Sequence, residues 1–128
     1  MKKYKTIVID PPWDIKFGKD TKWFLRPSMS SPKAGPSRAN YNKGFNYPTM
    51  TLKQLAELPV NLLSEKDSHF YLCVIYKYIP ESYDLVKAWG FTPSVLLTWA
   101  KTPRGLGLGG TFVQSTEHIL FCRKGSLK

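Results

Sequence analysis

The sequence predicts an α/β domain with a largely parallel sheet. Four short runs of β-branched, aliphatic and aromatic residues are typical of strands, and segments with helical spacing separate the first three of them. Parallel strands need crossover connections of this kind, so the alternation favours a parallel sheet. The chain has 128 residues, of which 42% are hydrophobic, and this suits one globular domain spanning residues 1–128.

The first predicted strand covers residues 6–9 (TIVI), and its β-branched run indicates a buried strand. Asp10 follows directly and stands at the carboxyl end of this strand. No periodicity is sustained afterwards, and residues 28–37 are rich in Ser, Pro, Lys and Gly. We therefore expect a long basic loop at residues 14–46, and loops of this length inside a domain are usually functional or disordered.

The charge of the chain favours a polyanionic partner such as nucleic acid. The formal net charge is +10, and salt weakens binding that rests on such charge. Within the basic loop, lysines and arginines interleave with Trp23, Phe24, Tyr41 and Phe45, which suits phosphate contact combined with base stacking. A lysine-rich, solvated surface would give the same net charge, so charge alone does not decide between the two.

The first predicted helix starts at Thr51. Thr51 and Gln54 fit a capping box, and Pro59 closes the segment. Residues 69–76 (HFYLCVIY) then form an apolar run that predicts a second buried strand.

Pro80 and Gly90 mark the limits of the next predicted helix, because Pro suits the first helical position and Gly the position just past the end. Trp89 and the apolar stripe near it are expected in the core. Residues 94–100 (SVLLTWA) and 118–123 (HILFCR) predict the third and fourth strands.

Ligands of open α/β sheets bind outside the carboxyl ends of the strands. Asp10 and Lys101 each directly follow a predicted strand, so we expect both at the same end of the sheet. Lys101 could equally be a solvated strand end. Residues 104–110 (RGLGLGG) fit the dinucleotide pattern formally, but no helix is expected after them. We interpret this segment as a flexible loop near the site in which Arg104 contacts phosphate.

The string Asp10-Pro11-Pro12-Trp13 has the most informative chemistry in the chain. Two prolines fix two φ angles and remove two backbone donors, so the turn is stiff and presents the Asp10 carboxylate and the Pro11 carbonyl as acceptors. Trp13 adds a flat apolar face. This set matches a planar ring with an exocyclic amine, whose two hydrogens the acceptors can take. The alternative is an ordinary turn at a strand end in which Asp10 acts as a cap.

A second polar pair, Glu117 beside His118, is capable of acid–base chemistry. A polar pair at the start of a strand is more often structural, and we favour the structural interpretation.

The string at residues 10–13 is the signature of amino-group methyltransferases that use S-adenosylmethionine. Nearly the whole chain resembles the MT-A-seventy-type N6-adenine methyltransferases, and its layout is most similar to their phage and bacterial branch. The resemblance rests on an ordered set of motifs, namely Tyr47-Pro48-Thr49-Met50, Leu58-Pro59-Val60, Phe70-Tyr71-Leu72, Ala88-Trp89-Gly90-Phe91, Thr98-Trp99-Ala100-Lys101-Thr102 and Glu117-His118 with Leu120.

The resemblance implies a Rossmann-like fold, S-adenosylmethionine as cofactor and methyl transfer to adenine N6 in nucleic acid, with DNA expected rather than RNA. A duplex substrate would require the base to be flipped out. The roles that it implies are catalysis by Asp10, Pro11, Pro12 and Trp13, cofactor contact by Asp10 and Lys101, and substrate contact by Trp13, Tyr47 and Arg104.

Family members usually continue past the Glu-His strand with segments that supply much of the cofactor pocket. We therefore expect this chain to lack a carboxyl-terminal cofactor-binding segment and one strand. The exposed sheet edge would then pair with a partner subunit or with a second copy. The alternative function is that of a truncated, catalytically inactive relative that binds nucleic acid or serves a partner subunit.

No apolar run is long enough to cross a bilayer, and the first residues lack the apolar region of a signal peptide. Cys73 and Cys122 lie far apart in apolar runs, so neither a disulfide nor a metal site is expected. These features favour a cytoplasmic protein with no membrane partner.

Overall fold

A computed structural model of the protein describes residues 2–14, 48–101 and 115–127. The chain divides into two compact units. The first consists of Met1–Pro11 with Leu52–Lys128, and the second of Pro12–Thr51. All named helices and strands belong to the first unit.

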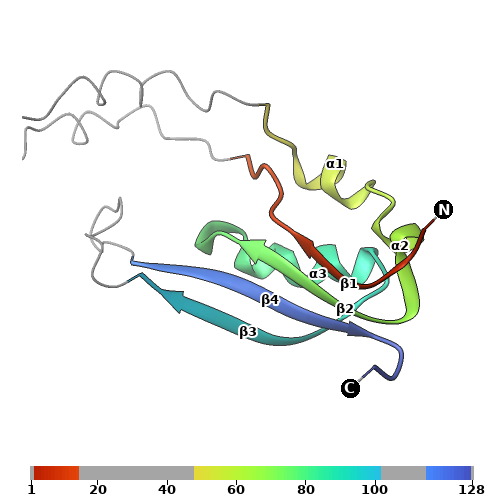
Figure 1. The fold of residues 1–128 in the computed structure, drawn as a ribbon. Coiled ribbons are helices and arrows are strands. Elements are labelled where there is room, and N and C mark those ends of the chain that lie inside the picture. The colour runs from red at the N-terminus through yellow and green to blue at the C-terminus, as the bar shows by residue number, and fades with distance from the viewer. Residues whose placement is uncertain (1, 15–47, 102–114, 128) are drawn as a thin grey trace, which may run out of the picture. The chain divides into compact units, whose positions relative to one another are not determined.

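The first unit contains a four-stranded sheet with the order β1-β2-β4-β3 (Figure 1). Its strands are β1 (Tyr4–Ile9), β2 (Ser64–Val74), β3 (Thr92–Ala100) and β4 (Thr116–Lys124). β1 pairs with β2 in parallel, and β4 is antiparallel to both β2 and β3. Consequently β1, β2 and β3 point in one direction and β4 in the other.

The α/β class is confirmed, but the prediction of a mostly parallel sheet is wrong, because two of the three strand pairings in the described sheet are antiparallel. The cause is the position of β4. It follows β3 in the chain but lies between β2 and β3, so every pairing that it makes is antiparallel. An antiparallel neighbour needs no helical crossover, and the sequence between β3 and β4 shows no helical pattern.

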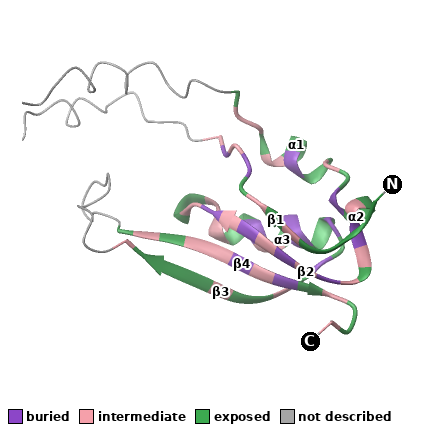
Figure 2. Ribbon diagram, viewed as in Figure 1, coloured by how far each residue is buried: buried purple, intermediate pink, exposed green. Residues whose placement is uncertain are grey.

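Helices cover one face of the sheet (Figure 1). They are α1 (Leu52–Ala56), α2 (Val60–Leu63), the 3₁₀ helix Tyr76–Tyr78 and α3 (Ile79–Ala88). In β2 every second residue from Ser68 to Val74 is buried, whereas the residues between them are half-buried (Figure 2). Since successive side chains of a strand point to opposite faces, the buried set faces the helices.

Aromatic packing joins the helices to this face. Phe70 of β2 meets Trp89 edge-on at 5.5 Å between ring centroids and lies 4.7 Å from Phe91. The Trp89 indole N–H donates to the Leu55 carbonyl oxygen of α1 at 3.0 Å. The prediction that Trp89 belongs to the core is therefore confirmed. Gly90 follows with φ 82°, a conformation that glycine adopts without strain.

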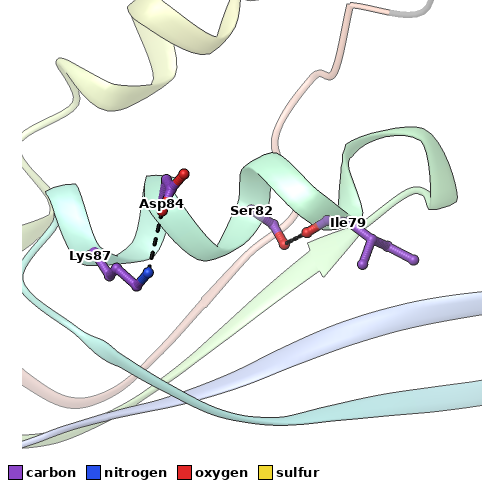
Figure 3. Close-up of polar contacts among 4 residues, drawn as sticks. All are labelled: Ile79, Ser82, Asp84 and Lys87. Carbon is purple, nitrogen blue, oxygen red and sulfur yellow. Dashed lines mark hydrogen bonds and ion pairs between the residues drawn. The ribbon is translucent and has the colours of Figure 1, made fainter.

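The limits of α3 agree closely with the sequence signals. Pro80 lies in its first turn, as predicted. Inside the helix the buried Ser82 hydroxyl donates to the Ile79 carbonyl at 2.6 Å, and the Lys87 ammonium lies 3.3 Å from the Asp84 carboxylate on the exposed side (Figure 3). The first pair satisfies a buried hydroxyl, and the second is a solvated ion pair.

β1 departs from the expectation of a buried strand. It lies at an edge of the sheet, and Val8 is 65% exposed because the face that it points to has no helix among the described residues. A β-branched run shows that a strand forms but does not show whether the strand lies inside the sheet or at its edge.

No helix in the described part of the chain is long and apolar enough to cross a membrane. Cys73 and Cys122 are free thiols.

Candidate functional site

The carboxyl ends of β1, β2 and β3 meet the amino end of β4 at one end of the sheet. The register shows this, because Ile9 pairs with Leu72 near the end of β2, and Trp99 near the end of β3 pairs with Glu117 of β4. We call this region the carboxyl end of the sheet. Asp10 and Lys101, which follow β1 and β3 directly, both lie there, so the structure places these two residues at the same end as predicted from the strand order.

Asp10 presents its carboxylate to solvent at this end, whereas Pro11 is buried. Because Ile9 pairs with Leu72, Asp10 comes opposite Cys73 of β2. Burial raises the pKa of the Cys73 thiol, and the negative charges of Asp10 and Glu117 raise it further. Asp10 follows β1 and Glu117 lies in β4, and these two strands flank β2. The charges of both residues therefore raise the pKa of the same thiol, which remains protonated at neutral pH.

Lys101 forms a second polar group with residues of β3 and β4. Its ammonium makes an ion pair with the Glu117 carboxylate and lies 5.4 Å from the centroid of the Trp99 ring. Its backbone N–H donates to the Ser115 carbonyl oxygen at 2.8 Å, which continues the pairing of β3 and β4 by one step. Lys101 is therefore held by its backbone and its side chain at the end of β3.

Three strand spacings separate the β1 and β3 positions, about 14 Å. Asp10 and Lys101 therefore cannot contact the same atom of a small ligand. Their opposite charges instead suit two separate groups of an elongated ligand, or two different ligands.

Glu117 and His118 do not form an acid–base pair. Adjacent residues of a strand point to opposite faces, and only Glu117 shares its face with Trp99. The His118 ring contacts the hydroxyls of Thr98 at 3.3 Å and Thr116 at 3.4 Å instead. The structural interpretation of this histidine is confirmed, and the Lys101–Glu117 pair is the contact that the sequence analysis did not predict.

The second half of the proline-rich turn belongs to the second unit. The Pro12 carbonyl accepts a hydrogen bond from the Met50 N–H at 2.9 Å, and Trp13 forms an isolated parallel bridge with Met50. The Thr49 hydroxyl lies 3.4 Å from an Asp14 carboxylate oxygen. Residues 12–14 and residues 49–50, which are far apart in sequence, thus meet within the second unit. The buried Trp13 ring is 4% exposed.

Several predicted site residues lie outside the described residues. These are Tyr47, Arg104 with the glycine-rich segment 104–110, and all of the basic loop except Asp14. Among the residues that the structure describes, no group of three or more His, Cys, Asp or Glu side chains could hold a metal ion.

Comparison with known proteins identifies the class of protein. The chain is 29% identical over 133 residues to the type II methyltransferase M.MunI of Mycoplasma sp, an alignment that covers 98% of this chain and 53% of that relative. The chain thus spans about half the length of this relative. Both this likeness and the turn at residues 10–13 point to the methyltransferases.

The family profile of MT-A70 matches residues 4–128, nearly the whole chain. The protein belongs to the MT-A70 family, and the resemblance stated from its motifs is confirmed.

Proposed function

We propose that the protein transfers a methyl group from S-adenosylmethionine to N6 of adenine in nucleic acid, with DNA as the substrate. The observation that carries this proposal is the exposed Asp10 directly before Pro11, at the carboxyl end of the sheet in an MT-A70 protein. This is where open α/β sheets bind ligands.

The role of the turn follows from its acceptors. The Asp10 carboxylate and the Pro11 carbonyl accept the two hydrogens of the adenine amine. These hydrogen bonds localise the nitrogen lone pair, which otherwise conjugates into the ring, and direct it at the methyl donor. Pro12 and Trp13 shape the pocket for the base. S-adenosylmethionine, when bound, supplies the electrophilic methyl group on its sulfonium.

The charges at the carboxyl end of the sheet fit this cofactor. S-adenosylmethionine has an amino-acid part with an ammonium and a carboxylate, and Lys101 offers a cation to the carboxylate while Asp10 offers an anion to a positive group. The Lys101 side chain is held by Glu117 and Trp99, so it need not be ordered anew when the cofactor binds.

The directions of three strands support the same proposal. β1, β2 and β3 point in one direction, and α3 connects β2 to β3 across one face of the sheet. β4 lies between β2 and β3 and is antiparallel to both.

A nucleic-acid substrate is supported by the formal net charge of +10, and the type II methyltransferase relative supports methyl transfer. In this proposal Tyr47 and Arg104 contact the substrate, and the target base leaves the duplex before reaction, at a cost of a few kcal/mol, roughly.

The test is to replace Asp10 by alanine and to quantify N6-methyladenine by mass spectrometry of nucleosides after incubation with DNA or RNA and S-adenosylmethionine. Asp10 is exposed, so Asp10→Ala should fold, and we expect methyl transfer to fall by on the order of a hundredfold or more. Asp84→Ala, which removes an exposed carboxylate on α3, should retain full activity.

Calorimetric titration with S-adenosylmethionine separates the cofactor step from the chemistry. We expect both Asp84→Ala and the unmodified chain to bind S-adenosylmethionine. Methyl transfer by Asp10→Ala at the unmodified rate contradicts the assigned role of Asp10, and transfer to a base other than adenine contradicts the assigned substrate.

A further inference from the structure

We infer that the end of the sheet remote from Asp10 binds the phosphate backbone of double-stranded DNA through a patch of basic side chains. β1 and β2 begin at this end, and β4 finishes there (Figure 1). We call it the basic end, and we define it by the charged residues of segments 2–5, 65–67 and 123–124. These residues are Lys2, Lys3, Lys5, Glu65, Lys66, Asp67, Arg123 and Lys124.

The strand register brings the three segments together. Thr6, His69 and Arg123 are successive partners across β1, β2 and β4, and Lys124 pairs with Ser68 one step further out. Since adjacent strands lie about 5 Å apart, the positions of β1 and β4 are separated by about 10 Å. The basic end is therefore a narrow surface that crosses three strands.

A turn after β4 contributes a further contact between the segments. The Ser126 N–H donates to the Asp67 carboxylate at 2.7 Å. This hydrogen bond lowers the pKa of the Asp67 carboxyl, and the positive charges of Lys66 and Lys5 lower it further. Both lysines therefore lie close to the same carboxylate, so segments 2–5 and 65–67 share this end of the sheet.

The basic end has an excess of positive charge. Six basic residues stand against two acidic ones, which leaves a net charge of +4. The ion pairs within the described residues join Lys87 to Asp84 and Lys101 to Glu117, so no direct ion pair neutralises any of the six basic side chains. Such an excess lowers stability through self-repulsion and attracts polyanions.

Two of the lysines are held by neutral partners. The Lys124 ammonium donates to the side-chain oxygen of Asn61 and, at 2.7 Å, to the hydroxyl of Ser64. The Lys2 ammonium lies 5.6 Å from the centroid of the Tyr4 ring, which is 45% exposed. Neutral partners fix the position of a charge without cancelling it, so both ammonium groups keep a full charge for an anionic ligand.

The dimensions of the basic end suit a DNA duplex. The separation of about 10 Å between β1 and β4 is close to the width of the major groove, about 12 Å, whose two rims consist of phosphates. A duplex also presents one negative charge per about 1.7 Å of its axis, so several phosphates face a surface of this width. A membrane is disfavoured, because Tyr4 is the one exposed large hydrophobic residue of the three segments and interfacial binding needs an apolar face.

The basic end is separate from the turn at residues 10–13. Asp10 follows Tyr4 by six residues, which corresponds to about 20 Å along an extended strand. This distance equals about six base pairs of duplex at about 3.4 Å each. A duplex that presents a base to Asp10 therefore extends far enough to place phosphates at the basic end, and this step alone rests on the proposed function.

The experiment measures how salt weakens DNA binding in the absence of S-adenosylmethionine. Fluorescence anisotropy gives the affinity for a labelled duplex of about 20 base pairs between about 50 and about 200 mM salt, where each phosphate contact contributes about 0.9 to the logarithmic slope. Lys5→Gln combined with Arg123→Gln removes two exposed charges, so the slope should become shallower by about 2. Lys53→Gln combined with Lys87→Gln removes two exposed lysines of α1 and α3, is matched in net charge and should leave the slope unchanged.

Circular dichroism verifies that each variant folds, and Lys3→Gln combined with Lys66→Gln replaces the first pair if that pair does not fold. Three results overturn the inference. They are the absence of DNA binding by the unmodified chain, an unchanged slope in the first pair, and an equal change of slope in the control pair. Binding to phosphatidylserine vesicles that the first pair loses, while its DNA slope stays unchanged, would assign the surface to a membrane instead. Because the assay contains no cofactor and no methyl transfer, failure here is distinct from failure of the proposed activity.

Discussion

Replacement of Glu117 by glutamine tests whether this residue positions Lys101 or merely stabilises the fold. The side chains of Lys101 and Glu117 are 37% and 52% exposed, and ion pairs with this much solvent contribute about 0.2–1 kcal/mol. Glutamine keeps the shape of the side chain and removes the charge. The free energy of unfolding should therefore fall by less than about 1 kcal/mol. Lys101→Met also removes the contact with the Trp99 ring, which should lower the free energy of unfolding by a further 0.5–1 kcal/mol, roughly.

Urea unfolding followed by circular dichroism measures these losses. In parallel, methyl transfer should show a several-fold higher KM for S-adenosylmethionine in Glu117→Gln with kcat within about twofold, because a mobile Lys101 binds the cofactor less well but is not part of the chemistry. Asp84→Asn, which breaks the exposed ion pair with Lys87 on α3, is the matched control and should change neither constant.

Two results would refute this reasoning. A loss of more than about 2 kcal/mol in Glu117→Gln would show that the pair is a structural element of the sheet, contrary to its exposure. An unchanged KM in both Glu117→Gln and Lys101→Met would remove Lys101 from the cofactor site.

Three further predictions concern the fold. Trp89→Phe removes the indole donor to the buried Leu55 carbonyl and should lower the free energy of unfolding by about 2–3 kcal/mol in urea, whereas a loss under about 1 kcal/mol would contradict the packing described. Gly125→Ala should lower the free energy of unfolding by about 1–3 kcal/mol, because φ is 67° and the added Cβ would clash with the Asp67 carboxylate. Thermal unfolding measures this loss, and an unchanged midpoint would contradict the prediction. Burial raises the pKa of Cys122 from 9.0 to about 12, so the stability that the protonated thiol contributes is complete below pH 9 and is lost as the pH rises toward 12. Cys122→Ala should therefore lose less stability over this range than the unmodified chain, and identical pH profiles would show that the thiol has no part in it.

Local signals predicted much of the architecture. Pro80 and Gly90 delimit α3, because a fixed φ suits a helix start and a positive φ suits the position past its end. Asp10 and Lys101 were expected at one end of the sheet because each follows a strand, and β1 and β3 do point in the same direction. These inferences depend only on neighbours in the chain.

Features that depend on distant contacts were not predictable in the same way. The insertion of β4 between β2 and β3 is decided by pairing across the sheet, and its apolar run is compatible with any place in the order. The exposure of β1 likewise depends on what lies beside it. The Lys101–Glu117 pair joins residues 16 positions apart, and only the register of β3 against β4 brings them together.

The candidate site likewise combines features that local sequence indicates with features that depend on distant contacts. The chemistry that we propose for it comes from the string at residues 10–13, because prolines and a carboxylate have the same properties wherever they stand. The bond between the Met50 N–H and the Pro12 carbonyl had no signal in either motif considered alone.

The place of β4 also has a consequence for the order of events during synthesis. β4 leaves the ribosome after β1, β2 and β3, yet it is the strand that bridges β2 and β3. Until residues 116–124 have emerged, β3 has no bonding neighbour, and the nascent chain presents two unsatisfied strands to whatever is nearby. A chaperone that shields them until translation has passed this point would raise the yield of native protein more than one acting earlier.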